Sequence, residues 1–276
     1  MNKMRSIPVS IVTAIRSAWR YTFGDPRRAM IALFAAACLA VSLSIALAYA
    51  HYTVVPGWQL WTWLAAVIGI LLALIPPLTS RLPRRTFWIL LGLLAAALAL
   101  RLWRLTSLPP GLHVDELGVA DFAMRQVFFG PYETINPFMT GPASQPALFH
   151  YIVAGFIKLF GPQIFSLRLM SALVGTLGVL ATYFMVRAFS GKQTALFAAL
   201  LMITYHFHIH WSRIALNNIW DTLWVPLMLG PFLWGWRKHW SGGAAISGLA
   251  VGISQYFYAG SKVGLILLFV LVIGVA

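Results

Sequence analysis

Four of the six acidic residues in this chain lie within 19 positions of one another: Asp115, Glu116, Asp121 and Glu133. Asp115 and Glu116 follow a Pro-Pro-Gly turn at 109–111, and this order predicts a helix that begins near Asp115. Two adjacent carboxylates at a helix start could supply a general base and an orienting or metal-binding group. The same pair could instead serve only as a helix cap, because acids favour helix N-termini.

Three cations on separate segments could bind a negatively charged substrate beside these acids. Arg168 lies inside an apolar segment, where an arginine is costly and is usually paired or functional. Its expected partner is a carboxylate of the acidic window or a substrate phosphate, which arginine binds well; the alternative is a side chain that only reaches the lipid surface. Arg213 and Lys262 lie on later segments. Such a set of charges would suit a lipid that carries a phosphate.

Several uncharged polar residues are further candidates for substrate contact. Gln145 precedes a proline and a short apolar stretch that carries His150 and Tyr151, and Asn217 follows Arg213. His150 and Tyr151 are also typical of residues at a boundary between apolar and polar surroundings. We therefore treat all four as candidates that the fold must bring to the acids.

Three histidines alternate with apolar residues at positions 206, 208 and 210. On a helix, His206 and His210 would share a face, and this spacing occurs in zinc sites. The glutamate of zinc-protease helices is missing here, however, so histidines at a membrane interface are the preferred interpretation. We assign no metal ligands and name no certain cofactor, while a divalent metal at the acidic window is an option.

The elements that must position these residues are apolar helices. Hydrophobic residues make up 60% of the 276 residues and charged residues 9%, which excludes a disordered chain. The net charge is +14, but the basic residues separate apolar runs rather than form a solvated face, so we expect no nucleic-acid partner. A single cysteine excludes a disulfide scaffold. We expect an all-α fold, a polytopic transmembrane helical bundle.

About eight apolar runs approach the length that spans a bilayer, about 20 residues. They are 30–50, 58–78, 86–103, 164–186, 194–210, 214–236, 243–258 and 263–276. Residues 146–160 are apolar but short, and we expect an interfacial helix there. The Lys and Arg residues before the first run and between the second and third runs are typical of cytoplasmic segments. The N-terminus is then cytoplasmic, and the loop 104–163 with its acids is extracytoplasmic.

The chain divides into three predicted parts. Residues 1–28 form a basic cytoplasmic N-terminus, residues 29–85 an added pair of spans, and residues 86–276 the module that carries the candidate site. The sequence stops inside an apolar run, so we expect this module to be incomplete at its C-terminus and the chain to be an N-terminal fragment.

Taken in order, these features resemble the membrane glycosyltransferases of the GT-C class. The pattern comprises the Asp-Glu pair 115–116, a short apolar helix ending in Phe-Gly at 160–161, Leu-Arg-Leu at 167–169 and Ser-Arg at 212–213. It is most similar to the protein O-mannosyltransferase and aminoarabinose-transferase-like group, from about Leu100 to the end of the chain.

The resemblance implies that a sugar passes from a polyprenyl-phosphate carrier to an acceptor at the outer face, with inversion. It implies that Asp115 is the catalytic base, that Glu116 supports it, and that Arg168 supports the carboxylate or the donor phosphate. Gln145 stands where many members have a lysine. The expected partners are the bilayer, the lipid-linked donor and an acceptor that is a protein, a lipid or a glycan. The expected location is the plasma (inner) membrane, with several spans.

Two other functions use the same residues. A transporter or flippase for a lipid-linked or anionic solute would need the same cations, but should also show an internal repeat and broken helices near the midplane. A non-catalytic membrane scaffold would leave the Asp-Glu pair as a helix cap alone. Transfer of a sugar is the function that the whole pattern favours.

Overall fold

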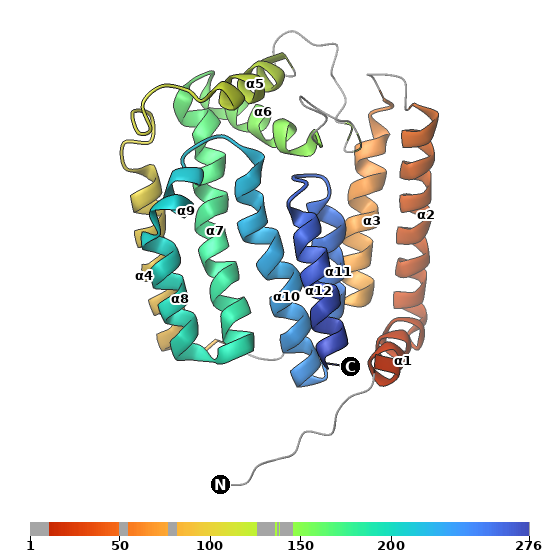
Figure 1. Ribbon diagram of the computed structural model, residues 1–276. Coiled ribbons are helices and arrows are strands. Elements are labelled where there is room, and N and C mark those ends of the chain that lie inside the picture. The colour runs from red at the N-terminus through yellow and green to blue at the C-terminus, as the bar shows by residue number, and fades with distance from the viewer. Residues whose placement is uncertain are drawn as a thin grey trace.

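The computed structural model describes residues 11–49, 55–76, 82–125, 136, 138 and 146–275. The regular elements of this described part are helices, which confirms the predicted all-α class (Figure 1). In chain order they are α1 (Ile11–Phe23), α2 (Pro26–Ala48), α3 (Trp58–Leu74), α4 (Arg84–Leu102), α5 (Val114–Met124), α6 (Leu148–Phe160), α7 (Ile164–Ser190), α8 (Lys192–Thr204), α9 (His206–Trp211), the 3₁₀ helix η3 (Asn217–Trp220), α10 (Asp221–Lys238), α11 (Gly242–Ser254) and α12 (Ser261–Val275).

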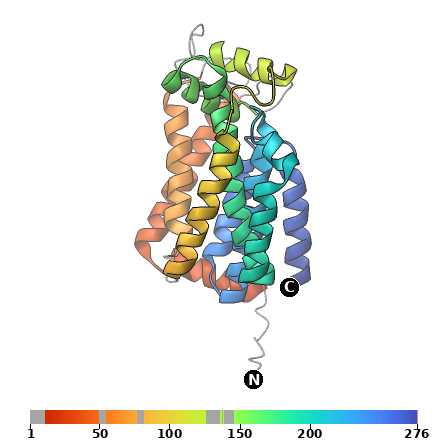
Figure 2. The ribbon, with the colours of Figure 1, turned by 90° about the vertical axis from the view of Figure 1, so that its left-hand side faces the viewer.

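The long helices run side by side as a bundle, and α7 lies near its centre (Figures 1 and 2). α7 packs against α4, α6, α8 and α10. Two glycines on α7 permit close packing against α10 and the residue after α9: a Cβ atom on Gly178 would lie 2.6 Å from Thr222 Oγ1 of α10, and one on Gly175 would lie 2.4 Å from Ser212 Oγ. The pair α2 and α3 pack on each other and reach the rest of the bundle through α11.

Within the described residues, three helices are long and apolar enough to cross a membrane: α2, α4 and α7. They correspond to the predicted runs 30–50, 86–103 and 164–186. Five shorter apolar helices also occur in the bundle or at its end: Trp58–Leu74, Leu148–Phe160, Lys192–Thr204, Gly242–Ser254 and Ser261–Gly274. The arrangement of eight spans therefore stays a prediction.

Two of the predicted runs are not single helices. The run 194–210 is broken at Tyr205, whose backbone leaves the helical conformation (φ −65°, ψ 109°) between α8 and α9. The Thr204 hydroxyl donates to the carbonyls of Leu200 (3.1 Å) and Leu201 (3.3 Å), a local bond typical of bent or ending helices. The prediction of one helix over 214–236 was also wrong at its start. The helix α10 begins only at Asp221, after the short helix η3.

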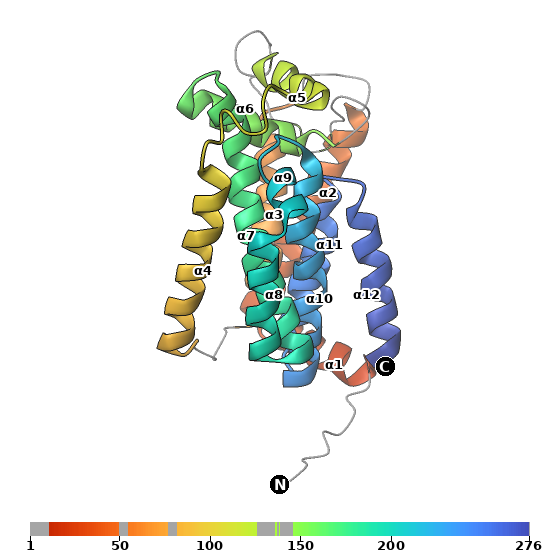
Figure 3. The ribbon, with the colours of Figure 1, turned by 60° about the vertical axis from the view of Figure 1, so that its left-hand side comes forward.

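The helices α5 and α6 lie across one end of the bundle, as Figures 1 and 3 show. The predicted helix near Asp115 is confirmed as α5, and the short apolar helix predicted at 146–160 is confirmed as α6. The interfacial position of these two helices remains a prediction. α6 packs on α7 and α5 packs on α6, so the two form a layer at this end of the bundle, and this layer carries Asp115, Glu116 and Asp121.

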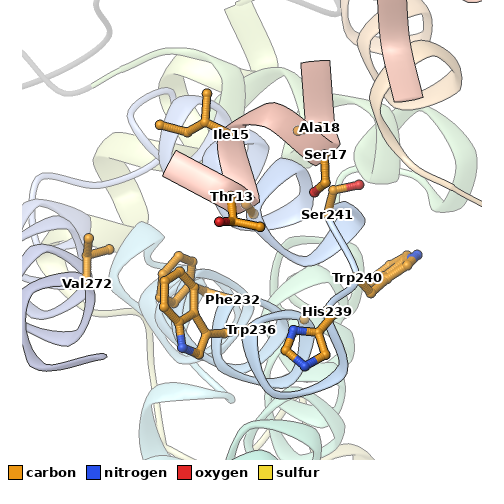
Figure 4. A pocket seen from close by; sticks show the side chains of 12 residues that line it. Thr13, Ile15, Ser17, Ala18, Phe232, Trp236, His239, Trp240, Ser241 and Val272 are labelled. Atoms are coloured by element: carbon orange, nitrogen blue, oxygen red, sulfur yellow. The ribbon is translucent and has the colours of Figure 1, made fainter. Parts of the chain in front are cut away.

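At the opposite end of the bundle, α1 lies below α2 and packs against α2 and α3 (Figure 1). A cavity of about 370 Å³ lies between α1 and the end of α10, and its lining includes Phe232, Trp236 and Trp240 (Figure 4). This cavity lies at the far end of the bundle from α5 and α6. It is therefore separate from the candidate site.

Candidate active site

Glu116 of α5 and Arg168 of α7 form a fully buried ion pair, with both side chains 0% exposed. Arg168 Nε donates to Glu116 Oε1 and Nη2 donates to Oε2, both at 3.0 Å. Two parallel charge-assisted bonds of this kind are among the strongest polar contacts in proteins. The backbone N–H groups of His113 (3.0 Å) and Ala215 (2.9 Å) also donate to this carboxylate. Glu116 thus accepts four hydrogen bonds from three separate segments.

These contacts keep Glu116 ionised. Burial raises the pKa of its carboxyl, but the hydrogen bonds from Arg168, Ala215 and His113, together with the charge of Arg168, lower it by more, so the pKa lies below its usual value. With its acceptor positions filled and its side chain fully covered, Glu116 has no accessible lone pair for a substrate proton. Its role in this structure is to join α5 to α7.

The remaining N–H groups of Arg168 hold the loop between α4 and α5. Nη1 donates to the carbonyls of Leu105 (3.2 Å) and Pro109 (2.9 Å), and Nη2 donates to the carbonyl of Gly111. Gly111 has φ +72°, a conformation that glycine adopts without strain. All five N–H groups of Arg168 therefore donate within the chain, and in this conformation none is left for a donor phosphate.

Arg213 also donates to backbone carbonyls, in this case at the end of α4 and in the loop after it. Its side chain is buried, and it donates to the carbonyls of Leu100 (2.7 Å), Trp103 (2.6 Å) and Leu108 (3.0 Å). The last carbonyls of a helix lack partners within the helix, and a cation placed there also suits the helix dipole. Arg213 is thus bound to the same α4–α5 connection as Arg168.

Asp115 is next to Glu116 but points outward, with its side chain 69% exposed. The helix start that carries it is fixed: the Asp115 N–H donates to His113 Nδ1 (3.2 Å), and Glu116 accepts from the His113 N–H in a reciprocal capping box. Asp115 Oδ2 lies 3.5 Å from His113 Nδ1. The same nitrogen accepts from the Asp115 N–H, so both groups of Asp115 meet the ring that caps the helix.

The other acids of the window are placed differently. Asp121 accepts from Arg125 Nε at 2.9 Å, an exposed pair one turn apart on α5. Glu133 lies outside the described residues, and so does the predicted contact residue Gln145. Asp115 is therefore the acid of the described window that combines exposure with a fixed backbone and is not bound to a cation.

The predicted uncharged contact residues on α6 lie beneath α5. His150 is buried, and its ring meets those of Phe122 and Phe149 with centroids 4.9 and 5.0 Å away. Burial lowers the pKa of His150 to about 4, although contacts with the backbone at Pro146 and Ala147 oppose the shift. His150 is thus a neutral packing residue at pH 7.

Tyr151 and Asn217 both have partners within the chain. The Tyr151 hydroxyl accepts from the Asn136 N–H at 3.5 Å, and Asn217 Nδ2 donates to the Phe257 carbonyl at 3.1 Å. Lys262 is different: it is exposed near the start of α12, which begins at the same end of the bundle as α5 and α6 (Figure 1).

The three histidines at 206–210 lie in different surroundings. His206 and His210 are exposed, whereas His208 is buried and lies 2.7 Å from the Arg101 guanidinium. Among the residues that the structure describes, no group of three or more His, Cys, Asp and Glu side chains could hold a metal ion.

Sequence reasoning missed Arg101, which is fully buried near the end of α4. Its Nη1 donates to the Ala97 carbonyl (2.9 Å), and its Nε donates to Ser212 Oγ (3.2 Å). Gly175 leaves space for the Arg101 side chain, because a Cβ atom at position 175 would lie 3.3 Å from Arg101 Nε. A lone arginine among the apolar residues of 92–103 was the available signal. Arg101 links α4 to α9 and Ser212, the segment that leads to Arg213.

The comparisons with known proteins bear on the second half of the chain. Residues 144–275 match the family model of dolichyl-phosphate-mannose-protein mannosyltransferases. Arg168, Arg213 and Lys262 lie inside the matched segment, whereas Asp115 and Glu116 precede it. No curated protein and no solved structure is similar enough to this chain to count as a match. Over residues 144–275 the chain is therefore similar in sequence to the dolichyl-phosphate-mannose-protein mannosyltransferases.

Proposed function

We propose that this protein transfers a sugar from a polyprenyl-phosphate carrier to a hydroxyl acceptor at the extracytoplasmic face, with Asp115 as the general base. The family match supports a membrane glycosyltransferase. The observation that carries the choice of base is the contrast at the start of α5: Glu116 is enclosed by Arg168, while Asp115 is exposed on the same fixed helix start.

The chemistry follows from the properties of the reactants. A hydroxyl group is a weak nucleophile, so a positioned carboxylate assists by taking its proton as the oxygen bonds to the anomeric carbon. The bond from that carbon to the carrier phosphate breaks, and the polyprenyl phosphate leaves with the bonding electron pair. Fixed cations stabilise the negative charge that develops on the phosphate.

Lys262 is our preferred contact for the donor phosphate. Arg168 and Arg213 donate to carboxylate and carbonyl groups of the chain, so they act by positioning α5 and the α4–α5 connection. Lys262 is exposed at the end of the bundle that carries α5. Its ammonium group suits a phosphate as a point charge.

We further propose that the bundle crosses the membrane with α1 on the cytoplasmic side and α5 and α6 outside. The turn from α7 to α8 and the end of α10 lie at the same end as α1 (Figure 1). These two places carry Arg187, Lys192, Arg237 and Lys238. Cations of short loops concentrate on the cytoplasmic side, so this placement supports the orientation. The eight spans would be α2, α3, α4, α7, α8 with α9, α10, α11 and α12.

The test is a transfer assay with the full-length protein in lipid nanodiscs. Polyprenyl-phosphate mannose serves as donor, a membrane extract supplies acceptors, and product is followed by mass spectrometry, with and without a chelator of divalent metals. Asp115→Asn should lower transfer about 100-fold or more, the size typical of losing a general base. Activity unchanged in this variant would end the assignment of Asp115.

The transporter alternative gives a different result in the same preparation. Reconstituted in liposomes, a flippase would move the lipid-linked sugar between leaflets without forming a new glycosidic bond. Movement of the donor in both wild type and Asp115→Asn, with no glycosylated product in either, would favour transport over transfer.

A further inference from the structure

The helix α1 carries an exposed apolar row on one side. Ile15, Trp19 and Phe23 follow one another at every fourth position, a spacing that places them on the same side of a helix. They are 61%, 63% and 42% exposed, and the rings of Trp19 and Phe23 lie against each other with centroids 4.3 Å apart. Ile15 also lines the cavity between α1 and α10 (Figure 4). The described part of the protein thus leaves three large apolar side chains on one helix uncovered.

Two arginines run beside this apolar row. Arg16 and Arg20 each follow a member of the row by one position, which is about 100° around the helix, and both are exposed. The salt bridges of the described residues include neither of them, and Asp25, the acid nearest in sequence, lies 3.5 Å from Arg28 instead. Their charges therefore have no counter-charge in the described part of the chain. The residues that we call the exposed face of α1 are Ile15, Arg16, Trp19, Arg20 and Phe23.

The opposite side of α1 holds the helix to the bundle. Tyr21 lies two positions after Trp19, about 200° around the helix, so it points away from the apolar row. The Tyr21 hydroxyl donates to the carbonyl of Ile75, just after α3, at 3.5 Å. The guanidinium of Arg28 on α2 lies 3.7 Å from the centre of the Tyr21 ring. These contacts fix which side of α1 faces outward.

The exposed face of α1 lies next to the start of a spanning helix. α1 ends at Phe23, and α2, which is long and apolar enough to cross a membrane, begins at Pro26. Because only two residues separate the helices, α1 lies at the boundary between lipid and water when α2 spans the bilayer, as proposed above. Helices that carry aromatic and basic side chains together are typical of this boundary, since the rings enter the acyl region and the guanidinium groups reach the head groups.

We propose that the exposed face of α1 binds anionic phospholipids of the adjacent leaflet. The charges of Arg16 and Arg20 favour an anionic head group over a zwitterionic one, and each cation near a charged membrane contributes a preference of about fivefold. The apolar row favours a lipid over a soluble acidic protein, because Trp19 and its neighbours leave water when they enter the acyl region. In the orientation proposed above, this is the cytoplasmic leaflet.

Photolabelling of the whole protein tests this binding. The protein is placed in phosphatidylcholine nanodiscs that contain equal trace amounts of two probes, a phosphatidylglycerol and a phosphatidylcholine with the same photoreactive diazirine at the same acyl position. After irradiation, mass spectrometry measures how much of each probe is attached to residues 11–25. The ratio of the two labels on this segment is the readout. It requires no glycosyl transfer, so failure of the proposed reaction leaves the result unaffected.

We expect phosphatidylglycerol to label residues 11–25 at least about fivefold more than phosphatidylcholine, and high salt should reduce this preference by screening the charges. Arg16→Gln with Arg20→Gln should bring the ratio close to one, whereas Arg16→Lys with Arg20→Lys should keep most of it, because the charges remain. The matched control is Arg84→Gln with Arg85→Gln. It removes two exposed arginines from the start of α4, at the same end of the bundle (Figure 1), and should leave the ratio on α1 unchanged.

The apolar row has a test of its own. Trp19→Gln removes the most exposed ring of the row and should lower labelling of residues 11–25 by both probes by a similar factor, without changing their ratio. Unchanged labelling in this variant would contradict insertion of the row into the acyl region.

Equal labelling by the two probes in the wild type would overturn the proposal, and this comparison needs no variant. A preference for phosphatidylglycerol that persists in Arg16→Gln with Arg20→Gln would contradict the role of the arginines. Loss of the preference when soluble polyglutamate is added would show that the exposed face of α1 prefers an acidic protein segment, and it would overturn the choice of a lipid.

Discussion

Asp115 and Glu116 are adjacent in the sequence and lie in opposite environments: the Asp115 side chain is 69% exposed, and that of Glu116 is 0% exposed. The two carboxylates therefore differ in what they can do. Glu116 accepts bonds from α7 and from the segment before η3, while Asp115 faces outward from the start of α5. This separation predicts different effects of removing each charge.

Glu116→Gln should destabilise the protein strongly, and Asp115→Asn should not. The first change leaves the buried Arg168 without its counter-charge, which costs about 3–5 kcal/mol. The second removes an exposed carboxylate at a helix start, a change of about 1 kcal/mol or less. Unfolding of the purified protein in detergent, followed by tryptophan fluorescence, measures both. Equal losses of stability in the two variants would show that the buried Glu116–Arg168 pair contributes no more to stability than the exposed carboxylate of Asp115.

Arg168 and Glu116 should also be energetically coupled. Arg168→Met alone leaves a buried carboxylate, whereas the double change Arg168→Met with Glu116→Leu removes both charges. The double variant should therefore be more stable than the sum of the single effects predicts, by about 1–3 kcal/mol. It should still be less stable than the wild type, because the carbonyls of Pro109 and Leu105 lose their donor. If the stability change of the double variant equals the sum of the two single changes, the two side chains are not energetically coupled.

The close packing of α7 against the segment after α9 depends on Gly175. A Cβ atom there would lie 2.4 Å from Ser212 Oγ and 3.3 Å from Arg101 Nε. Gly175→Ala should thus displace Ser212 and lower stability by about 1–3 kcal/mol. Gly252→Ala is the matched control, since nothing lies within 4 Å of a Cβ there and alanine is the better helix former. A melting temperature that is lowered by the control as much as by Gly175→Ala would contradict this explanation.

The sequence predicted those features that depend on local residues. The Pro-Pro-Gly turn predicted the start of α5, and the short apolar stretch at 146–160 predicted α6. The sequence could not predict that Glu116 is buried and Asp115 exposed, because this difference depends on partners far along the chain. Arg168 is 52 residues from Glu116, and Ala215 is 99 residues away. Only the packing of α7 against the loop segments decides which acid is enclosed.

Distant contacts and local hydrogen bonds also explain why sequence reasoning missed Arg101 and the helix break at Tyr205. Arg101 had the appearance of a charge at the end of a span, and its contact with His208 joins residues 107 positions apart. The break at Tyr205 interrupts a run whose composition is apolar on both sides, so hydropathy gave no sign of it. Hydrophobic length predicts that a helix forms, whereas the ends of helices depend on local hydrogen bonds such as that of Thr204.

His150 should make the stability of the protein depend on pH between about 6.5 and 4. Burial lowers its pKa to about 4 in the folded protein, whereas an unfolded histidine titrates near 6.5. As the pH falls through this window, the unfolded chain takes up a proton that the folded chain does not, so stability decreases as the pH falls. The full effect is about 3 kcal/mol, and it can be measured as the shift of the unfolding midpoint in detergent with pH.

His150→Leu is the variant that isolates this effect, because leucine fills the aromatic site without titrating. Its stability should fall less steeply than that of the wild type between pH 6.5 and 4.5; a second buried histidine, His208, keeps part of the dependence in both proteins. Glu116 does not interfere in this range: its pKa lies below its usual value, so its contribution is lost only as the pH falls further. If wild type and His150→Leu lose stability in parallel between pH 6.5 and 4.5, the buried histidine is not the cause.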